Sequence, residues 1–265
     1  MSRPGAPLPR IHRWRTNLIQ IPLLFCITAI CGSISLLVSL VERSGRVQHR
    51  IARFWARALV WGSGCSLTIR GAENLRKHPV VVFAANHTSY MDTPVIFASL
   101  PCQFRILAKK ELWPIAFIGW YLSRSGQIPI DTRNQRATLS SLGAAVKALR
   151  GGMPLFVFPE GGRTPDGAMQ NFLSGAAYLA IRAQVPLVPI ALSGVYDLLP
   201  MHARHFYPGE LTLIAGEPID TTGMHLREID DLTEKLKQTI AGLLHKCTED
   251  VFSSELTGLE DVQAE

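Results

Sequence analysis

Residues 79–92 read PVVVFAANHTSYMD, and the apolar half of this stretch decides the fold. The run VVVFAA shows no alternation of polar and apolar side chains, which is typical of a strand buried on both faces. Residues 154–158, PLFVF, repeat the pattern. Strands of this kind occur in parallel sheets covered by helices. The sequence therefore predicts an α/β domain with a largely parallel sheet flanked by helices.

Around this strand the chain alternates short β-branched runs with helical patterns. We expect strands at 65–70, 79–85, 104–108, 154–158, 186–192 and 210–215, and a short strand within 126–133. Helices are expected at 92–99, 111–123, 134–150, 172–184 and 226–247. These elements form one domain over residues 63–253, after an N-terminal segment of residues 1–62. Residues 254–265 carry four acids and no base, and we expect this tail to be frayed.

The positive charge of the 265-residue chain is concentrated in its N-terminal segment. The net charge is +6, from 27 Lys and Arg against 21 Asp and Glu, yet residues 1–57 alone carry nine Arg and one Glu. These bases flank an apolar run instead of covering the folded domain, which favours a membrane surface over nucleic acid as a partner. Five cysteines without a C-x-x-C pair indicate neither a disulfide framework nor a zinc site, and they fit a reducing compartment.

Residues 16–41 contain no charged side chain. As a helix, residues 19–41 would measure about 34 Å at ~1.5 Å per residue, enough to span the ~30 Å core of a bilayer. Cys31, Ser35 and Ser39 form a stripe of small residues suited to close packing against another helix. The alternatives are a cleaved signal peptide, for which the run is too long and lacks an A-x-A site, and a buried helix of a soluble protein.

Residues 47–60 predict a second helix, which has a basic stripe beside an apolar face. The stripe consists of Arg46, Arg50, Arg53 and Arg57. Such a helix suits the headgroup layer of a membrane. Alternatively, the arginines are the solvated side of a helix that packs on the core. The first interpretation makes residues 1–62 a membrane-docking two-helix segment. Its orientation stays open, because residues 1–15 and 42–57 each carry a net charge of +4.

Two polar stretches follow predicted strands, where open α/β sheets hold their active sites. The first contains His87 and Asp92, in which the carboxylate can orient the imidazole and stabilise its protonated form during general-base catalysis. His225 and Asp230 repeat the spacing, but at the start of a helix, where ~3.6 residues per turn splay the side chains by about 140°. A strand-to-helix turn lets the first pair fold together. The alternative role of His87 is that of a structural turn histidine.

The second polar stretch is FPEGGRT, at residues 158–164. Gly161 and Gly162 allow a ligand to approach the backbone closely, and Arg163 can bind phosphate oxygens with two parallel hydrogen bonds. A tight turn in which Glu160 pairs with Arg163 is the alternative. The sequence contains neither a P-loop lysine motif nor G-x-S-x-G, which argues against nucleotide binding and serine-hydrolase chemistry.

Further cations follow two other predicted strands. Lys109 and Lys110 precede Glu111, and Arg133 ends the stretch GQIPIDTR at residues 126–133. Together with Arg163 these side chains can surround an anionic headgroup. Taken singly, each of them is a common solvated surface charge.

The stretches NHTSYMD, AKKELW, GQIPID, FPEGGRT and VPI occur in the order and approximate spacing of the glycerophospholipid acyltransferases. Over residues 65–215 the chain resembles a bacterial-type lysophosphatidate (1-acyl-sn-glycerol-3-phosphate) acyltransferase. The resemblance implies that His87 is the general base and that Asp92 orients it. It also implies that the other motif residues bind the glycerol phosphate: Glu160, Gly161, Gly162, Arg163, Thr164, Lys109 and Arg133.

The resemblance further implies a reaction. A fatty acyl group would move from an acyl thioester to the sn-2 hydroxyl of lysophosphatidate, giving phosphatidate. The co-substrate would be the thioester of coenzyme A or of acyl carrier protein, with no bound cofactor, no metal and no covalent acyl-enzyme. The membrane lipid bilayer is the expected location, and in a bacterial cell this is the inner membrane with the catalytic domain on the cytoplasmic side.

The chain departs from the family pattern at two positions. In the second family motif Arg directly follows the Ile-Asp pair, whereas here Thr132 stands before Arg133. The third motif usually reads E-G-T-R-S, and here it reads EGGRT. The altered second motif leaves open another acceptor for the same chemistry, such as a different lysophospholipid or a lyso-aminolipid. A non-catalytic membrane protein that binds anionic lipid is the alternative from another class.

Overall fold

The computed structural model describes residues 14–131, 133–200, 203 and 205–262, with side chains described up to residue 250. The N-terminal helices are η1 (Thr16–Gln20), α2 (Ile21–Val38) and α3 (Arg46–Gly62). The strands are β1 (Ser66–Arg70), β2 (Val82–Ala85), β3 (Arg105–Lys109), β4 (Ile128–Ile130), β5 (Leu155–Val157), β6 (Leu187–Ser193) and β7 (Glu210–Ala215). The other helices are α4 (Asp92–Ser99), η2 (Lys110–Leu112), α5 (Ile118–Arg124), α6 (Gln135–Arg150), α7 (Gly175–Ala183), α8 (Val195–Leu198), η3 (Leu226–Glu228) and α9 (Ile229–Val262).

A seven-stranded sheet in the order β1-β7-β6-β2-β5-β3-β4 forms the centre of the fold. All of its pairings are parallel except β6 with β7, so the predicted largely parallel sheet is confirmed. Strand β2 lies in the middle, where Phe83 is opposite Phe156 on one side and Val188 on the other. Because β2, β5, β3, β4 and β6 run in the same direction, their carboxyl ends share one edge of the sheet.

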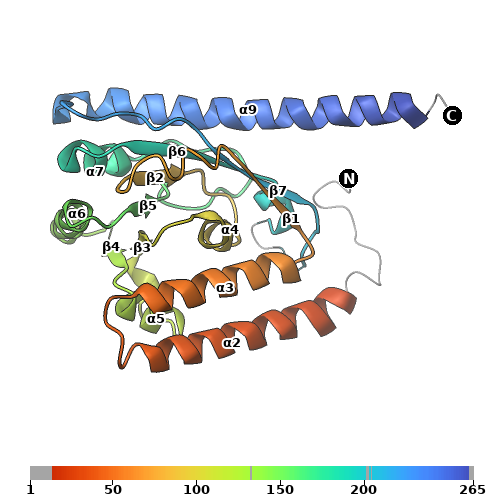
Figure 1. The fold of residues 1–265 in the computed structure, drawn as a ribbon, viewed down its shortest axis with the longest axis horizontal. Coiled ribbons are helices and arrows are strands. Elements are labelled where there is room, and N and C mark those ends of the chain that lie inside the picture. Colours follow the sequence, from red (N-terminus) through yellow and green to blue (C-terminus); the bar gives the residue numbers. More distant parts are fainter. Residues whose placement is uncertain (1–13, 132, 201–202, 204, 263–265) are drawn as a thin grey trace.

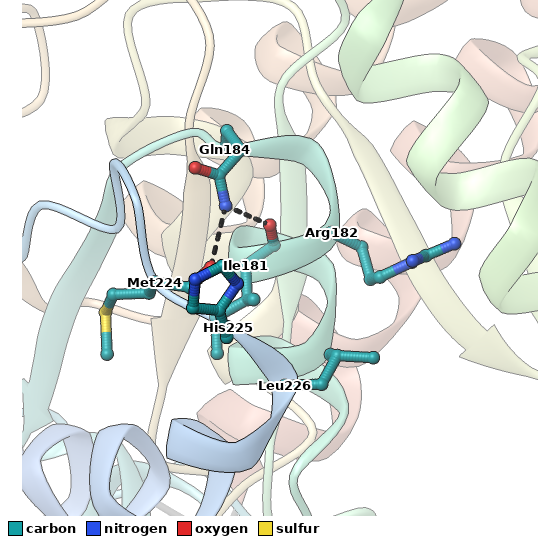
Figure 2. A pocket seen from close by; sticks show the side chains of 6 residues that line it. All are labelled: Ile181, Arg182, Gln184, Met224, His225 and Leu226. Carbon is teal, nitrogen blue, oxygen red and sulfur yellow. Dashed lines mark hydrogen bonds between the residues drawn. The ribbon is translucent and has the colours of Figure 1, made fainter.

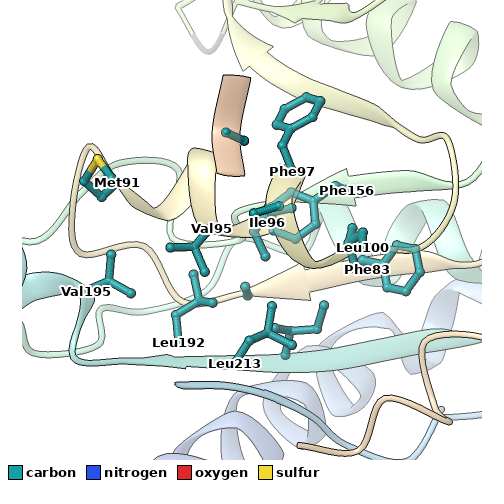
Figure 3. Packing of buried hydrophobic residues seen from close by; sticks show 14 of the residues in the cluster. Phe83, Met91, Val95, Ile96, Phe97, Leu100, Phe156, Leu192, Val195 and Leu213 are labelled. Carbon is teal, nitrogen blue, oxygen red and sulfur yellow. The ribbon is translucent and has the colours of Figure 1, made fainter. Parts of the chain in front are cut away.

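Helices cover both faces of the sheet, as the apolar strands require. Phe83 and Ala85 of β2 belong to the core beneath α3 and α4, whereas Val82 and Ala84 belong to the core beneath α6, α7 and α9. This division follows from the two-residue period of a strand. Figure 1 shows the resulting layers, with α9 outermost on one side and α2 outermost on the other. In Figure 3, side chains of α4 and the strands interdigitate in the first core.

Three expected helices differ in the structure. The helix expected at 111–123 is divided into η2 and α5, because Pro114 lacks an N–H and Phe117 adopts a φ of +63°. Here the N–H of Ile118 donates to the carbonyl of Ala116, which closes a strained γ-turn around Phe117. Helix α7 begins three residues later than expected. Helix α9 continues to Val262 and does not end at residue 247 as expected, because no proline in this stretch ends it.

Helix α3 lies between α2 and α4 (Figure 1). Its buried face includes His49, whose Nε2 is 3.1 Å from the carbonyl oxygen of Cys102. Burial lowers the pKa of His49 to about 4, so the ring is neutral and donates this bond. Arg53 and Arg57 donate to the carbonyls of Pro101 and Ala98, beside the end of α4. Half of the basic stripe therefore contacts the domain, as expected for a helix that packs on the core.

Helix α2 packs against α3 and leaves an apolar face exposed. The side chain of Gln20 donates to the carbonyl of Gly62 (3.0 Å), and the indole of Trp55 donates to Thr28 (2.9 Å). The stripe of Cys31, Ser35 and Ser39 is buried, as its small side chains predicted. From Thr16 to Val38 the chain is long and apolar enough to cross a membrane, with a mean hydropathy of 2.4 and only 17% of it buried. A core helix of a soluble protein is mostly buried, so the low burial of this segment argues against that alternative.

We expect the protein to remain on lipid vesicles in 1 M NaCl, because burial of the apolar face of α2 does not depend on counterions. Electrostatic attachment would be lost, since the Debye length falls to ~3 Å at 1 M salt. Replacing the exposed Phe25 and Leu37 together by Asp should abolish co-sedimentation, whereas Leu139→Asp on α6 should not change it. Release of the unmodified protein by the salt wash would contradict this expectation.

Candidate functional site

The carboxyl edge of the sheet gathers most of the polar residues that the sequence singled out. His87 follows β2, Glu160 follows the adjacent β5, and Lys109 ends β3, the next strand along. Arg133 follows β4, three strands from β2. At ~4.8 Å per strand this separation is about 14 Å. The structure thus brings His87, Glu160 and Lys109 together and leaves Arg133 at the rim, exposed to solvent.

His87 and Asp92 fold against one another, as a strand-to-helix turn allows. The Nδ1 atom of His87 lies 2.8 Å from Oδ2 of Asp92, which is fully buried at the first position of α4. The same oxygen accepts the backbone N–H groups of Thr88 (2.6 Å) and Ser89 (2.8 Å). One carboxylate therefore fixes both the turn and the ring that the turn carries.

This geometry gives the imidazole a defined protonation pattern. A neutral ring that donates its Nδ1–H to a carboxylate keeps an unshared electron pair on Nε2. The side chain of His87 is 14% exposed, so it can be reached from solvent while its partner Asp92 cannot. A proton taken up at Nε2 would create an imidazolium that the buried carboxylate stabilises, which is the requirement for a general base.

The rest of His87 is held from three sides. Its ring stacks on Phe158, with centroids 3.9 Å apart and planes 12° from parallel. Its N–H donates to Glu160 (2.6 Å), and its carbonyl accepts the N–H of Thr164 (3.1 Å). The preceding Asn86 exchanges two hydrogen bonds with the backbone of Leu192 and so joins the end of β2 to β6. Phe158 and Asn86 stand in the quoted motifs, but nothing in the sequence pattern gave them these roles.

Glu160 uses both carboxylate oxygens within the protein. Oε1 accepts the N–H of His87, and Oε2 accepts the N–H of Gln170 at 2.9 Å. The side chain is buried, and this burial, together with the charge of Asp92, raises the pKa of Glu160 although the two N–H groups oppose the rise. The structure therefore gives Glu160 a role in holding the loops, and the alternative of a Glu160–Arg163 pair is wrong.

The other residues of the EGGRT stretch divide into two groups. Gly161 has a φ of +70°, and a Cβ there would lie 2.8 Å from Leu173, so this position requires glycine. Thr164 is buried, and its N–H donates to the carbonyl of His87. Gly162 and Arg163 are partly exposed. A Cβ on Gly162 would lie 3.5 Å from Nζ of Lys109, an ordinary van der Waals distance, so this loop lies against the Lys109 ammonium.

Arg163 lies over an aromatic ring from the first motif. Its Cζ atom is 3.7 Å from the ring centroid of Tyr90, a residue to which the sequence pattern assigned no role. Lys110, by contrast, is 3.6 Å from Asp131 and so is partly neutralised. The cations that remain beside His87 are Lys109 and Arg163, which makes the open side of the site suitable for an anion.

The second His-Asp pair lies far from this edge. His225 precedes η3, and its N–H donates to Glu228 at 2.8 Å. It lines a hollow of about 400 Å³ with Gln184 and Met224, before the amino end of β6 and therefore at the opposite edge of the sheet (Figure 2). The expectation that this pair would not form a site agrees with its helical setting.

Glu160→Gln tests the holding role. Burial raises the pKa of Glu160, so the folded chain keeps a proton that the unfolded chain loses above a pH of ~4.3. Glu160 therefore makes stability fall as pH rises from there through the raised pKa, and the Gln variant should lack this slope in urea unfolding. Below a pH of ~4.3, where both side chains are neutral, the variant should also be less stable by about 1–3 kcal/mol, because one backbone N–H loses its acceptor.

Gln170→Ala is the matched control for this variant, because it keeps the backbone N–H that Glu160 accepts. It should unfold like the unmodified protein at every pH. Equal pH slopes for the unmodified protein and Glu160→Gln would contradict the role assigned to Glu160.

Comparison with known proteins agrees with this site. The Acyltransferase family matches residues 66–193, which include His87, Asp92, Lys109, Arg133 and the EGGRT stretch. A chloroplastic 1-acyl-sn-glycerol-3-phosphate acyltransferase of Arabidopsis thaliana is 29% identical over 198 residues, 74% of this chain and 54% of the relative. The 1-acyl-sn-glycerol-3-phosphate acyltransferase of Saccharomyces cerevisiae is 27% identical over 213 residues, 79% of this chain and 70% of the relative. The chain spans between 54% and 60% of the length of the plant relatives it matches.

The fold has a solved counterpart. The crystal structure of the 1-acyl-sn-glycerophosphate acyltransferase of Thermotoga maritima superposes with a TM-score of 0.75, covering 89% of this chain and 98% of that one at 24% identity. The matched sequence pattern over residues 66–193 and the shared fold both show a similarity of this chain to acyltransferases, and the buried His-Asp pair lies within the matched region.

Proposed function

We propose that the protein is an enzyme that transfers a fatty acyl group from an acyl thioester to the sn-2 hydroxyl of lysophosphatidate, giving phosphatidate. The observation that carries this proposal is the 2.8 Å contact between Nδ1 of His87 and buried Asp92, next to the cations of Lys109 and Arg163. A phosphorylated alcohol requires a base for its hydroxyl and a nearby cationic site for its phosphate, and these residues can supply both. The names of the relatives support the same acceptor.

The reaction follows from the chemistry of the two substrates. A hydroxyl is a poor nucleophile at neutral pH, whereas a thioester carbonyl is already activated. Nε2 of His87 takes the hydroxyl proton as the oxygen attacks the carbonyl carbon, and Asp92 stabilises the imidazolium. The carbon–sulfur bond then breaks and the thiolate receives the proton from His87. The acyl group passes directly to the oxygen, so no acyl-enzyme is needed, and the donor is the thioester of coenzyme A or of acyl carrier protein.

The acceptor phosphate would lie between Lys109 and Arg163. In lysophosphatidate the phosphate is on the carbon next to the reacting hydroxyl, so its ligands must be close to His87. Arg163 directly precedes Thr164, whose N–H donates to His87, and so meets this condition. Arg133, about 14 Å along the sheet edge at ~4.8 Å per strand, does not. The phosphate contact proposed for Arg133 by family resemblance is therefore assigned to Lys109 and Arg163.

We propose that α2 lies in the plane of the membrane interface. It runs antiparallel to α3, and α3 is bonded to the domain through His49, Arg53 and Arg57. A helix packed along its length on such a partner cannot cross the bilayer without drawing charged side chains into it. Its exposed apolar face continues on the segment around α5, where Phe117 contacts Gly32 and Trp120 is exposed. In a bacterial cell we infer the inner membrane, with the domain on the cytoplasmic side.

An acyl-transfer assay of the full-length chain in mixed micelles tests this function. With lysophosphatidate and an acyl thioester we expect phosphatidate to form, and the two donor types can be compared directly. His87→Ala should lower the rate by about 10²–10⁴-fold with unchanged thermal unfolding, because it removes the base. His225→Ala, at the opposite edge of the sheet, should keep full activity. Product formation only from another lysolipid, or equal losses in both variants, would refute the proposal.

Arg163→Lys tests the acceptor site. An ammonium cannot reproduce the planar fork of a guanidinium, so we expect the apparent KM for lysophosphatidate to rise roughly tenfold to a hundredfold. The apparent KM of the acyl donor should change little. A rise confined to the donor would assign Arg163 to the phosphate groups of coenzyme A or of the carrier protein. Lower thermal stability with both KM values unchanged would show that Arg163 has only a structural role.

A further inference from the structure

Tyr90 and Arg163 come from different motifs and meet at the mouth of the site. Tyr90 lies in the turn between β2 and α4 and is 54% exposed. Arg163 lies in the loop after β5, and its Cζ is 3.7 Å from the centre of the Tyr90 ring. The guanidinium is therefore in van der Waals contact with the aromatic face, where the ring quadrupole attracts a cation. An exposed aromatic side chain is therefore used for a contact with a cation.

Arg163 has no anionic partner within the described residues. Its Nε is buried and finds no hydrogen-bond acceptor among them. Glu160, three residues earlier in the chain, cannot supply one, because both of its oxygens accept backbone N–H groups. A buried donor without an acceptor costs free energy, so this geometry suits a site that a ligand completes. Tyr90 holds the guanidinium of Arg163 through the contact with its ring.

The contact also affects which headgroups the site can accept. An aromatic face within reach of a ligand attracts quaternary ammonium groups. Here the guanidinium of Arg163 covers that face of Tyr90, so the site presents a cation where a bare ring would favour a choline. A phosphate monoester, with its terminal oxygens free, can pair with the fork of Arg163. A phosphate capped by a cationic alcohol would bring its positive charge against Arg163.

We propose that Tyr90 is a positioning residue, which holds Arg163 over its ring and so makes the site select a phosphate monoester over a headgroup that ends in a cation. This inference rests on the proposed function and deepens it, because it concerns the acceptor site of that same reaction. It assigns the selectivity to a pair of side chains and not to Arg163 alone.

Tyr90→Leu and Tyr90→Phe separate the ring from the hydroxyl. We expect Tyr90→Leu to raise the apparent KM for lysophosphatidate about three- to tenfold, the range of a partly exposed cation–π contact, with kcat and the donor KM unchanged. Tyr90→Phe keeps the ring and should behave like the unmodified enzyme. Its preference for lysophosphatidate over lysophosphatidylcholine should also persist, whereas Tyr90→Leu should reduce it. Equal defects in both variants, or a defect in kcat alone, would overturn the proposal.

A double-mutant cycle with Arg163→Gln isolates the coupling. Once the guanidinium is gone, Tyr90→Leu should have no further effect on the acceptor KM. Independent losses that multiply would show that Tyr90 acts without Arg163 and would overturn the proposal.

A spectroscopic measurement keeps this inference separate from the proposed function. The Nε–H proton of Arg163 should show a ring-current shift in the NMR spectrum of the full chain and of Tyr90→Phe, and should lose it in Tyr90→Leu. Adding glycerol 3-phosphate as a probe should move the resonance in the first two proteins. A shift that persists in Tyr90→Leu refutes the pairing. A shift that behaves as expected in a protein that does not acylate lysophosphatidate supports the pairing and refutes the proposed function.

Discussion

The buried carboxylate of Asp92 is the interaction on which the site depends. One of its oxygens accepts three hydrogen bonds, from the backbone N–H groups of Thr88 and Ser89 and from Nδ1–H of His87. Without it, three donors would lose their acceptor, and the turn would have no single arrangement. Asp92 is also the first residue of α4, where a negative charge is favoured by the helix dipole. The imidazole is thus carried by the junction of two rigid elements and not by a free loop.

A second carboxylate supports the same histidine from the other side. Glu160 follows β5, the neighbour of β2, and it accepts the backbone N–H of His87. Asp92 therefore fixes the ring while Glu160 fixes the main chain. The raised pKa of Glu160 reflects the cost of burying this second negative charge near the first.

The sequence predicts the strands and helices that carry this site well, and it predicts the contacts between the side chains of the site poorly. Helix 92–99 was placed correctly, and β2 lies within the expected 79–85, because long apolar runs and a strand-to-helix turn are local signals. The alternative of a Glu160–Arg163 pair considers only neighbours along the chain, whereas the N–H groups that bind Glu160 belong to His87, which follows another strand, and to Gln170, ten residues further on. The contact of Tyr90 with Arg163 joins two loops that are far apart in the sequence, so no periodic pattern in the sequence indicates it.

The N-terminal helices illustrate the same limit. The apolar run of α2 and its buried small-residue stripe followed from composition and spacing. The spacing of the arginines of α3 does not show whether they face a membrane or the domain, because both interpretations require the same spacing. The position of α4 decides between these interpretations, because Arg53 and Arg57 donate to carbonyls beside the end of α4. Residue 132, the insertion in the second motif, lies outside the described residues.

The antiparallel packing of α2 on α3 has a consequence for how the enzyme would meet lipid. If α2 lies flat in the interface, as proposed, the protein would belong to a single leaflet, and its acceptor would arrive by lateral diffusion in two dimensions. The relevant concentration is then the mole fraction of lysolipid in that surface and not its amount per volume. Dilution of the membrane by other lipids slows such an enzyme, whereas dilution of the whole suspension does not, and the product stays in the leaflet where it forms.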